Sequence, residues 1–465
     1  MRMKNLYKKP ITNLRCSSWS RYCSISLVIL WTLLILGCIL LLHLYSNNNT
    51  SLNIIHPPPL PSHFHQLQHV EKENFQIPPP NKKRSPQSKS ITPLVDEFLD
   101  QDSSLRHVFF PHKTIDPMKT IGKGKNDSYN YYYPGKIWLD TDGNPIQAHG
   151  GCILYDENSS TYYWYGEYKD GPTYLHNNKG PARVDIIGVG CYSSKDLWTW
   201  KKEGIALAAE KTDKTHDLHK SNVLERPKVI YNEKTRKYVM WMHIDNANYA
   251  KATVGIAFSD TPTGPFKYLG SQRPHRYQSR DMTLFKDEDN VAYLIYSSEE
   301  NNVMHIGPLT EDYLNVTSVM KRIFVGQRRE APAMFKHKGT YYMVTSGCTG
   351  WAPNEALVHS AETILGTWET IGNPCVAGNK MFRVSTFLAQ STFVLPLTRF
   401  PGLFIFMADR WNPSELRDSR YVWLPLIVDG HEDQAFQYGF DNKLWPRVSI
   451  YWHKKWKLPL GWNTF

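Results

Sequence analysis

The sequence predicts an all-β fold, a five-bladed β-propeller, preceded by a single N-terminal transmembrane helix and a disordered stem. Three observations support this prediction. From about residue 135 onward, short β-rich runs alternate with turn residues, and almost no stretch has helical periodicity. A strand pattern repeats five times in this part of the chain. An apolar run lies near the start of the sequence, and a proline-rich segment follows it.

The apolar run covers residues 24–44 and contains no Asp, Glu, Lys or Arg. About 20 apolar residues in a helix span a bilayer core, so we expect a transmembrane signal-anchor here. Six basic residues precede the run, and the first acidic residue is Glu71. The positive-inside rule therefore predicts a cytosolic basic tail at residues 1–23 and a type II topology. A cleaved signal peptide is the alternative, but its apolar core is usually only about 7 to 15 residues long.

Residues 45–130 are rich in Pro, Ser, Asn and His and lack apolar periodicity, which predicts a stem that cannot bury a core. Docking of partner domains on its PPP runs is the alternative interpretation. Placement beyond the membrane would expose N-glycosylation sequons. The sequence has such sequons at Asn48, Asn49, Asn126, Asn158 and Asn315.

The remaining residues, 131–465, form the predicted globular domain. Of the seven cysteines, four lie in this domain and could form one or two disulfides: Cys152, Cys191, Cys348 and Cys375. None has the C-x-x-C spacing of a metal or redox site, so no zinc site is expected. No cofactor motif is present, and no D-x-D loop indicates calcium, although an ion could lie in the channel near His149.

The charge distribution argues against a nucleic-acid partner. Residues 1–100 hold 11 Lys and Arg against 5 Asp and Glu, so +6 of the net charge of +11 lies there. The predicted domain is only mildly basic, whereas a nucleic-acid binder gains most of its affinity from basic side chains on its folded surface. Aromatic residues reach 13%, which suits a protein that stacks flat side chains on sugar rings.

Each copy of the repeat opens with a strand that starts polar and turns apolar, followed by an aromatic strand and then a third strand. The opening strands are at 149–156, 225–232, 280–287, 330–337 and 390–397. Fourth, outer strands are expected at 198–207, 266–270 and 368–372. Five such four-stranded meanders predict a five-bladed propeller.

The innermost strands of a propeller surround its axis, so their first residues converge at one mouth of the channel. These residues are His149, Glu225, Asp281, Glu330 and Gln390. Three carboxylates in one small volume repel one another and raise one another's pKa, which favours an active site over a structural role. The structural alternative is that each residue caps its strand or pairs with a neighbouring arginine.

Seven motifs in this region occur in an order that matches a known family. They are DTDGNPIQAHGG (140–151), YYWYGEY (162–168), ERPKVIYN (225–232), SRDMTLFKD (279–287), EAPAMFK (330–336), SGCTGWAPN (346–354) and AQSTFV (389–394). The chain from about Tyr131 to its end thus resembles glycoside hydrolase family 43, specifically its exo-β-1,3-galactanase subgroup. With the type II anchor, it is similar to plant Golgi galactosidases that trim arabinogalactan. The resemblance implies an inverting exo-β-1,3-galactosidase in the Golgi membrane, with a lumenal catalytic domain and galactan as its partner.

The resemblance also implies the catalytic roles. Glu330 matches the general acid, and Asp281 matches the residue that orients this acid and tunes its pKa. Most of the family has an Asp base on the first inner strand, where this chain has Gln147 and His149. Gln390 occupies the position credited with holding the water, as a positioning residue or as an imidic-acid base. Glu225 is the alternative base and, by resemblance, a substrate-binding residue.

Sugar recognition would use an aromatic platform and polar partners for the hydroxyl groups. By resemblance these residues are Trp351, Tyr249, Glu167 and Trp164, and His149 is grouped with them. Trp164 alternates with tyrosines on a strand and fits a core position equally well.

Two alternative functions stay open. The first is another five-bladed glycosidase, such as an α-L-arabinofuranosidase, a β-xylosidase or an invertase-type transferase, although the last needs an N-terminal Asp nucleophile that the 147–151 segment lacks. The second is a catalytically silent sugar-binding propeller, which the missing Asp base makes conceivable.

Overall fold

The structure is a computed structural model that describes residues 114–115, 117, 130–175, 182–429, 435–438, 443–459 and 462. The predicted tail and membrane span, most of the predicted stem, and three of the sequons (Asn48, Asn49 and Asn126) lie outside the described residues. No helix within the described ranges is both long and apolar enough to cross a membrane.

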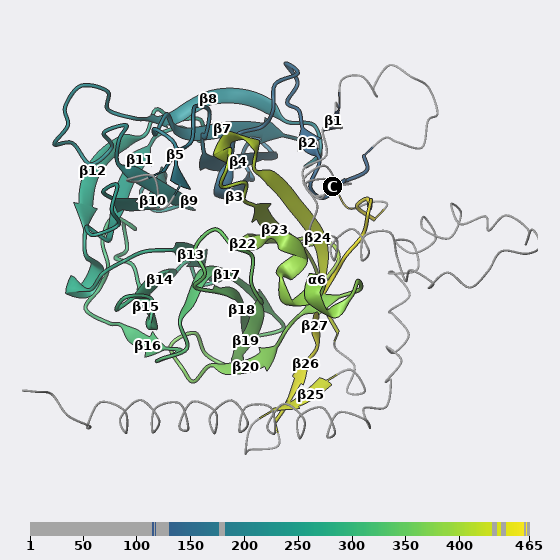
Figure 1. The fold of residues 1–465 in the computed structure, drawn as a ribbon. Helices are drawn as coiled ribbons and strands as arrows, with labels where there is room; N and C mark the ends of the chain where they lie inside the picture. The colour runs from purple at the N-terminus through teal and green to yellow at the C-terminus, as the bar shows by residue number, and fades with distance from the viewer. Residues whose placement is uncertain are drawn as a thin grey trace, which may run out of the picture. The chain divides into compact units, whose positions relative to one another are not determined.

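The described part of the chain forms five antiparallel sheets arranged in a ring, which confirms the predicted five-bladed propeller (Figure 1). Blade 1 consists of β3 (His149–Asp156), β4 (Thr161–Glu167), β7 (Gly188–Ser194) and β8 (Lys201–Ala208). Blade 2 consists of β9 (Val223–Asn232), β10 (Lys237–Asp245), β11 (Thr253–Ser259) and β12 (Lys267–Gln272). Blade 3 consists of β13 (Met282–Lys286), β14 (Ala292–Ser298), β15 (Val303–Pro308) and β16 (Lys321–Ile323). Blade 4 consists of β17 (Arg329–His337), β18 (Thr340–Gly347), β19 (Leu357–Ala361) and β20 (Glu369–Gly372).

Blade 5 differs from the others because strands distant in the sequence complete it. Its inner three strands are β22 (Gln390–Pro396), β23 (Leu403–Arg410) and β24 (Arg420–Val428). The late strand β27 (Val448–Tyr451) pairs with β24, and β21 (Cys375–Val376) pairs in parallel with β27 at the outer edge. The chain end therefore supplies the outer part of the last blade.

The remaining elements are short and lie around the blades. They are β1 (Thr114–Ile115) with β2 (Ile137–Trp138), the pair β5 (Tyr174–Leu175) and β6 (Ala182–Arg183), the pair β25 (Ala435–Tyr438) and β26 (Lys443–Pro446), the helix α6 (Lys380–Val384), and the 3-10 turns η3 (Pro274–Arg276), η4 (Thr386–Leu388) and η5 (Leu416–Asp418). Strand β1 lies within the segment predicted as stem, so regular structure begins before residue 131.

Aromatic packing joins the first and last blades of the ring. Trp138 and Trp164 pack against Trp423 of β24, with ring centroids 5.0 and 4.7 Å apart. The same buried cluster includes Trp456 near the chain end, whose backbone pairs with that of Tyr132. Burying several large rings between these blades removes much apolar surface from water and holds the ring closed.

Candidate active site

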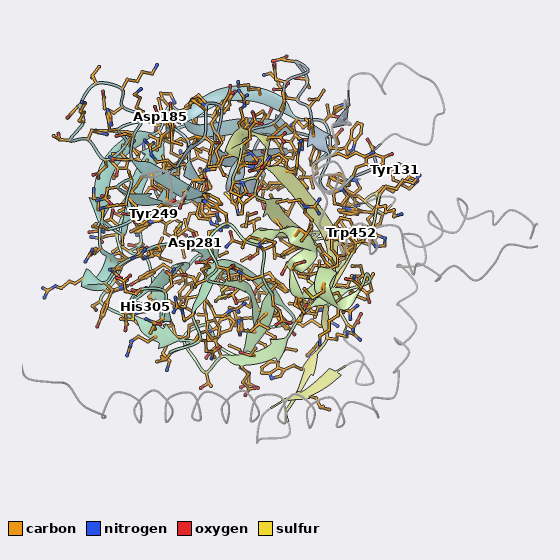
Figure 2. All side chains as sticks on the ribbon, in the orientation of Figure 1. Tyr131, Asp185, Tyr249, Asp281, His305 and Trp452 are labelled. Carbon is orange, nitrogen blue, oxygen red and sulfur yellow. The ribbon has the colours of Figure 1, made fainter. Side chains whose placement is uncertain are left out.

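The polar residues that open the inner strands meet around one cavity at the mouth of the propeller. The cavity has a volume of about 240 Å³, and its lining includes Glu225, Asp281, Glu330 and Gln390 from four different blades. Tyr249 and Asp281 lie toward the middle of the ring, whereas His305 lies out on blade 3 (Figure 2). The other lining residues are Glu167, Arg226, His243, Arg280, Asn301, Gly350, Trp351 and Trp411.

A repeated backbone feature turns these strand ends toward the channel. The residue after the opening polar residue has a left-handed backbone in three blades: Gly150 (φ 60°), Arg226 (φ 55°) and Ala331 (φ 51°). The pairing register shifts just after Glu330, as expected for a β-bulge. Left-handed non-glycine residues cost free energy and concentrate at functional sites. Gly150 is required, because a Cβ there would overlap the Glu167 carboxylate.

Arg226 connects residues of three other blades at the mouth of the channel. Its backbone N–H donates to Glu167 Oε1 (3.0 Å), and its guanidinium donates to Asp281 Oδ2 (2.9 Å) and Gln390 Oε1 (2.6 Å). A further bond runs from Nη1 to the carbonyl of Ser391 (2.7 Å). Only the fork of an arginine can satisfy these diverging acceptors at once, so Arg226 fixes the relative positions of Asp281 and Gln390.

Glu330 faces Gln390 and Asp281 in a largely desolvated position. Gln390 Nε2 donates to Glu330 Oε1 (3.1 Å), and Asn301 Nδ2 lies 3.4 Å from Glu330 Oε2. Burial and then the negative charge of Asp281 raise the pKa of Glu330 to about 8. The Asp281 carboxylate accepts from Arg226 and from the backbone N–H of Ala331 (3.1 Å). Glu330 is therefore suited to carry a proton at neutral pH while Asp281 is held in place.

Glu225 belongs to a separate hydrogen-bonded chain. It accepts from the Tyr249 hydroxyl (2.6 Å) and contacts His243 Nδ1 (3.3 Å), whose Nε2 contacts Asp245 (3.0 Å). Burial opposes charge on both partners, but their mutual hydrogen bond and attraction outweigh it. The pKa of Glu225 falls to about 2, and that of His243 rises to about 9. Glu225 is thus a fixed anion that accepts hydrogen bonds.

This hydrogen-bonded chain also bears on whether the cluster of Glu225, His243 and Asp281 could hold a metal ion. Ligand atoms of Glu225, His243 and Asp281 lie within 4.8 Å of one another. His243, however, faces carboxylates through both ring nitrogens and stays protonated, and Arg226 neutralises Asp281. A protonated imidazole cannot ligate a metal, so the cluster is an ion-paired network.

Two tryptophans form an aromatic wall of the cavity. The Trp351 and Trp411 rings meet edge to face, with centroids 5.2 Å apart, and the Lys169 ammonium lies over both at 5.8 and 5.7 Å. Lys169 is buried and paired with Glu167 (2.7 Å). The Trp411 indole N–H donates to Gln390 Oε1 (2.9 Å). The wall therefore both shapes the cavity and orients the Gln390 amide.

Two predicted substrate-binding residues lie elsewhere. Trp164 is only 1% exposed and packs among core aromatics, because its side of β4 faces the seam with blade 5. The prediction that it binds sugar is wrong. His149 is fully buried, with Nδ1 bonded to Asp409 (3.1 Å) and its ring stacked on Tyr421, so its assignment to substrate binding is also wrong.

Two further sequence expectations concern covalent features. The four cysteines of the domain, Cys152, Cys191, Cys348 and Cys375, are free, so the disulfides that the sequence allows do not form. Asn158 and Asn315 are exposed, as acceptors of a glycan must be.

Sequence reasoning did not assign a role to Arg226, Trp411 or Lys169. In the sequence, Arg226 is considered only as an arginine that could pair with a neighbouring acid. Its position directly after Glu225 nevertheless indicates that it lies near the predicted site. Trp411 follows β23 in a loop, and nothing in its local sequence indicates the contact with Gln390. Lys169 is two residues after Glu167, which is the spacing that puts both side chains on one face of an extended segment.

Two carboxyl groups that face one cavity, one of them with a raised pKa, are the groups that a glycosidase needs. The sequence profile of the glycosyl hydrolases family 43 matches residues 152–382. A GH43 β-1,3-galactosidase, solved with galactodeoxynojirimycin, is 39% identical (TM-score 0.60), and the match covers 70% of this chain and 100% of that one. The chain therefore belongs to glycoside hydrolase family 43 and is a glycoside hydrolase.

Two other solved structures are similar over the same region. The exo-β-1,3-galactanase of Phanerochaete chrysosporium, solved with β-1,3-galactotriose, is 36% identical (TM-score 0.61; 72% of this chain and 70% of that one). The exo-β-1,3-galactanase of Clostridium thermocellum is 34% identical (TM-score 0.58; 71% and 67%). No curated protein matches the chain.

Proposed function

We propose that this glycoside hydrolase is an exo-β-1,3-galactosidase, which releases terminal galactose from β-1,3-galactan with inversion of configuration. One observation carries the proposal: a desolvated Glu330, with its pKa raised to about 8, contacts Gln390 in a small cavity rich in hydrogen-bond acceptors. The similarity to a β-1,3-galactosidase and to exo-β-1,3-galactanases supports the choice of substrate.

In the proposed reaction, Glu330 donates its proton to the glycosidic oxygen as the bond to the anomeric carbon breaks. A water molecule on the opposite face of the ring attacks the anomeric carbon in the same step. Gln390 positions this water, and Asp281 keeps Glu330 protonated through its nearby charge. The proton that the water releases passes to the carboxylate of Glu225, the alternative base, or to the nitrogen of Gln390 in its imidic-acid form. In the second case the O–H proton of the imidic acid then leaves to solvent, and the neutral amide results.

The terminal galactose is held by the groups around the cavity. Glu225, fixed by Tyr249 and His243, accepts hydrogen bonds from sugar hydroxyls, as does Glu167. Trp351 offers the ring face on which the apolar face of galactose stacks. A cavity of about 240 Å³ suits one sugar at the chain end, which supports exo action.

The cellular setting is a proposal from the sequence. The apolar run at 24–44 and the basic residues before it favour a type II Golgi membrane protein with a lumenal catalytic domain. In that setting the natural substrate is the galactan of arabinogalactan proteins.

Product analysis tests the proposed function. The purified protein is incubated with β-1,3-galactan and, in parallel, with aryl α-L-arabinofuranoside and aryl β-xyloside. Galactose as the only product from galactan, with the α-anomer appearing first by NMR, is the expected result. Release from the arabinoside or xyloside instead would assign another glycosidase activity. Galactan binding without hydrolysis of any substrate would indicate a sugar-binding propeller.

A further inference from the structure

A second, larger cleft lies beside the candidate active site, at the seam between blades 1 and 5. Its volume is about 800 Å³, and we call it the seam cleft. Its polar lining includes Asn144, Gln147, Tyr168, Asp170, Lys202 and Arg417. Nothing in the proposed reaction uses it.

The seam cleft opens on the same face of the propeller as the candidate active site. Strand β4 ends at Glu167, which lines the active-site cavity, and Tyr168 and Asp170 of the seam cleft follow directly. Strand β23 likewise ends just before Trp411 of the active-site cavity, and the loop that follows carries Arg417. The same two loops therefore border both cavities.

A third cavity, of about 20 Å³, shares lining residues with both sites. It is lined by Tyr168 of the seam cleft together with Glu167, Glu225, Tyr249 and Trp351 of the active-site cavity. A polymer whose end lies in the active-site cavity therefore has a bordering cleft into which it can extend.

The lining of the seam cleft indicates a neutral, hydroxyl-rich ligand. Its charges largely cancel, because Arg417 pairs with Glu415 (2.9 Å) and Arg420 pairs with Asp418. The Lys202 ammonium lies over the Tyr168 ring and donates to its hydroxyl (2.7 Å). Such a surface offers planar polar groups beside an aromatic ring, the chemistry that recognises sugars, with little net charge to attract an anion.

Gln147 marks the floor of the seam cleft. Its Nε2 donates to the carbonyl of Arg417 (2.9 Å), which fixes the amide. The Oε1 of the same amide is buried and has no hydrogen-bond partner among the described residues. A buried acceptor without a donor is unusual, and a water enclosed beneath the surface of the cleft would supply one.

We propose that the seam cleft binds a neutral β-galactan segment of the same polymer whose terminal galactose occupies the active-site cavity. This inference rests on the proposed function. The test uses Arg417→Ala and Tyr168→Ala, with Arg322→Ala as the matched control. Arg322 forms an exposed ion pair with Glu299 at the outer edge of blade 3, so its removal imitates the loss of the Arg417–Glu415 pair away from the cleft.

For each variant, KM and kcat are measured on polymeric β-1,3-galactan and on β-1,3-galactobiose, and the melting temperature is recorded. Loss of one or two sugar contacts is expected to raise KM for the polymer about fivefold. The kcat/KM for galactobiose should match that of Arg322→Ala, because the disaccharide does not reach the cleft. An unchanged KM for the polymer in Arg417→Ala, which is on the surface and expected to fold, would overturn the inference.

A second measurement separates this inference from the proposed function. If the wild-type protein releases no sugar from galactan, the proposed function fails, and the cleft is tested by affinity electrophoresis in gels containing β-1,3-galactan. Weaker retardation of Arg417→Ala and Tyr168→Ala than of Arg322→Ala would support a glycan site. Equal retardation of the three variants would refute it.

Discussion

The Gln390 amide donates a hydrogen bond from Nε2 to Oε1 of Glu330 over 3.1 Å, which joins blades 4 and 5 across the channel. A flip of the amide would break two hydrogen bonds, because its Oε1 accepts from both Arg226 and Trp411. The second carboxyl oxygen, Oε2, lies beside Asn301 Nδ2 (3.4 Å), so each oxygen of Glu330 has one amide N–H next to it.

Replacing Glu330 with glutamine removes the proton donor and keeps the shape of the side chain. We expect Glu330→Gln to lower kcat on β-1,3-galactan by at least about a hundredfold, as loss of general-acid help does. The measurement is the initial rate of galactose release, with circular dichroism to verify folding. Turnover within about tenfold of wild type would remove Glu330 from the acid role.

The raised pKa of Glu330 predicts how both activity and stability depend on pH. The acid must be protonated, so kcat/KM should fall as the pH rises above about 8. Asp281→Asn removes the charge that, after burial, raises this pKa, so the alkaline limb should move to lower pH. A limb that does not move between wild type and Asp281→Asn would show that another group controls it.

The same shift is linked to folding free energy. A carboxyl whose pKa is higher in the folded state contributes stability at low pH, fully present below its ordinary pKa of 4.5 and lost as the pH rises through about 8. Glu330→Gln does not titrate, so its melting temperature relative to wild type should increase between pH 5 and pH 9. Parallel curves for the two proteins, measured by calorimetry, would contradict the raised pKa.

Arg226 holds charges that are costly to leave unpaired. Lysine keeps the positive charge but has no fork, so Arg226→Lys cannot reach Asp281, Gln390 and the Ser391 carbonyl together. We expect kcat to fall at least about tenfold and the unfolding free energy to fall by about 2 kcal/mol, as when a buried acceptor loses its hydrogen-bond donor. Urea unfolding measures the second effect. Lys201→Ala, which breaks an exposed pair with Glu203, is the control and should change stability by less than about 1 kcal/mol.

The strand repeat made the five blades and the convergence of Glu225, Asp281, Glu330 and Gln390 predictable, because both follow from local patterns that recur every 49 to 76 residues. Trp164 was assigned wrongly for a physical reason. Aromatic residues occupy both faces of β4 and both faces are buried, with Trp164 covered by Trp423 of blade 5, far along the chain. The contacts of Arg226 with Gln390 and the addition of β27 to blade 5 likewise depend on long-range pairing that no local pattern encodes.

Trp411 offers a test of whether the orientation of the Gln390 amide matters for the reaction. Trp411→Phe keeps an aromatic ring against Trp351 and removes part of the indole together with the N–H that donates to Gln390 Oε1. If Gln390 positions the attacking water, loss of this bond should lower kcat about tenfold, the equivalent of one hydrogen bond of about 1.4 kcal/mol, with KM changed less than twofold. Trp351→Phe is the matched control, since Trp351 is proposed to stack on galactose, so KM should rise while kcat is largely kept. If Trp411→Phe instead raises KM and leaves kcat unchanged, Trp411 is a sugar-stacking residue. Its indole N–H is then not required to orient the Gln390 amide for the reaction.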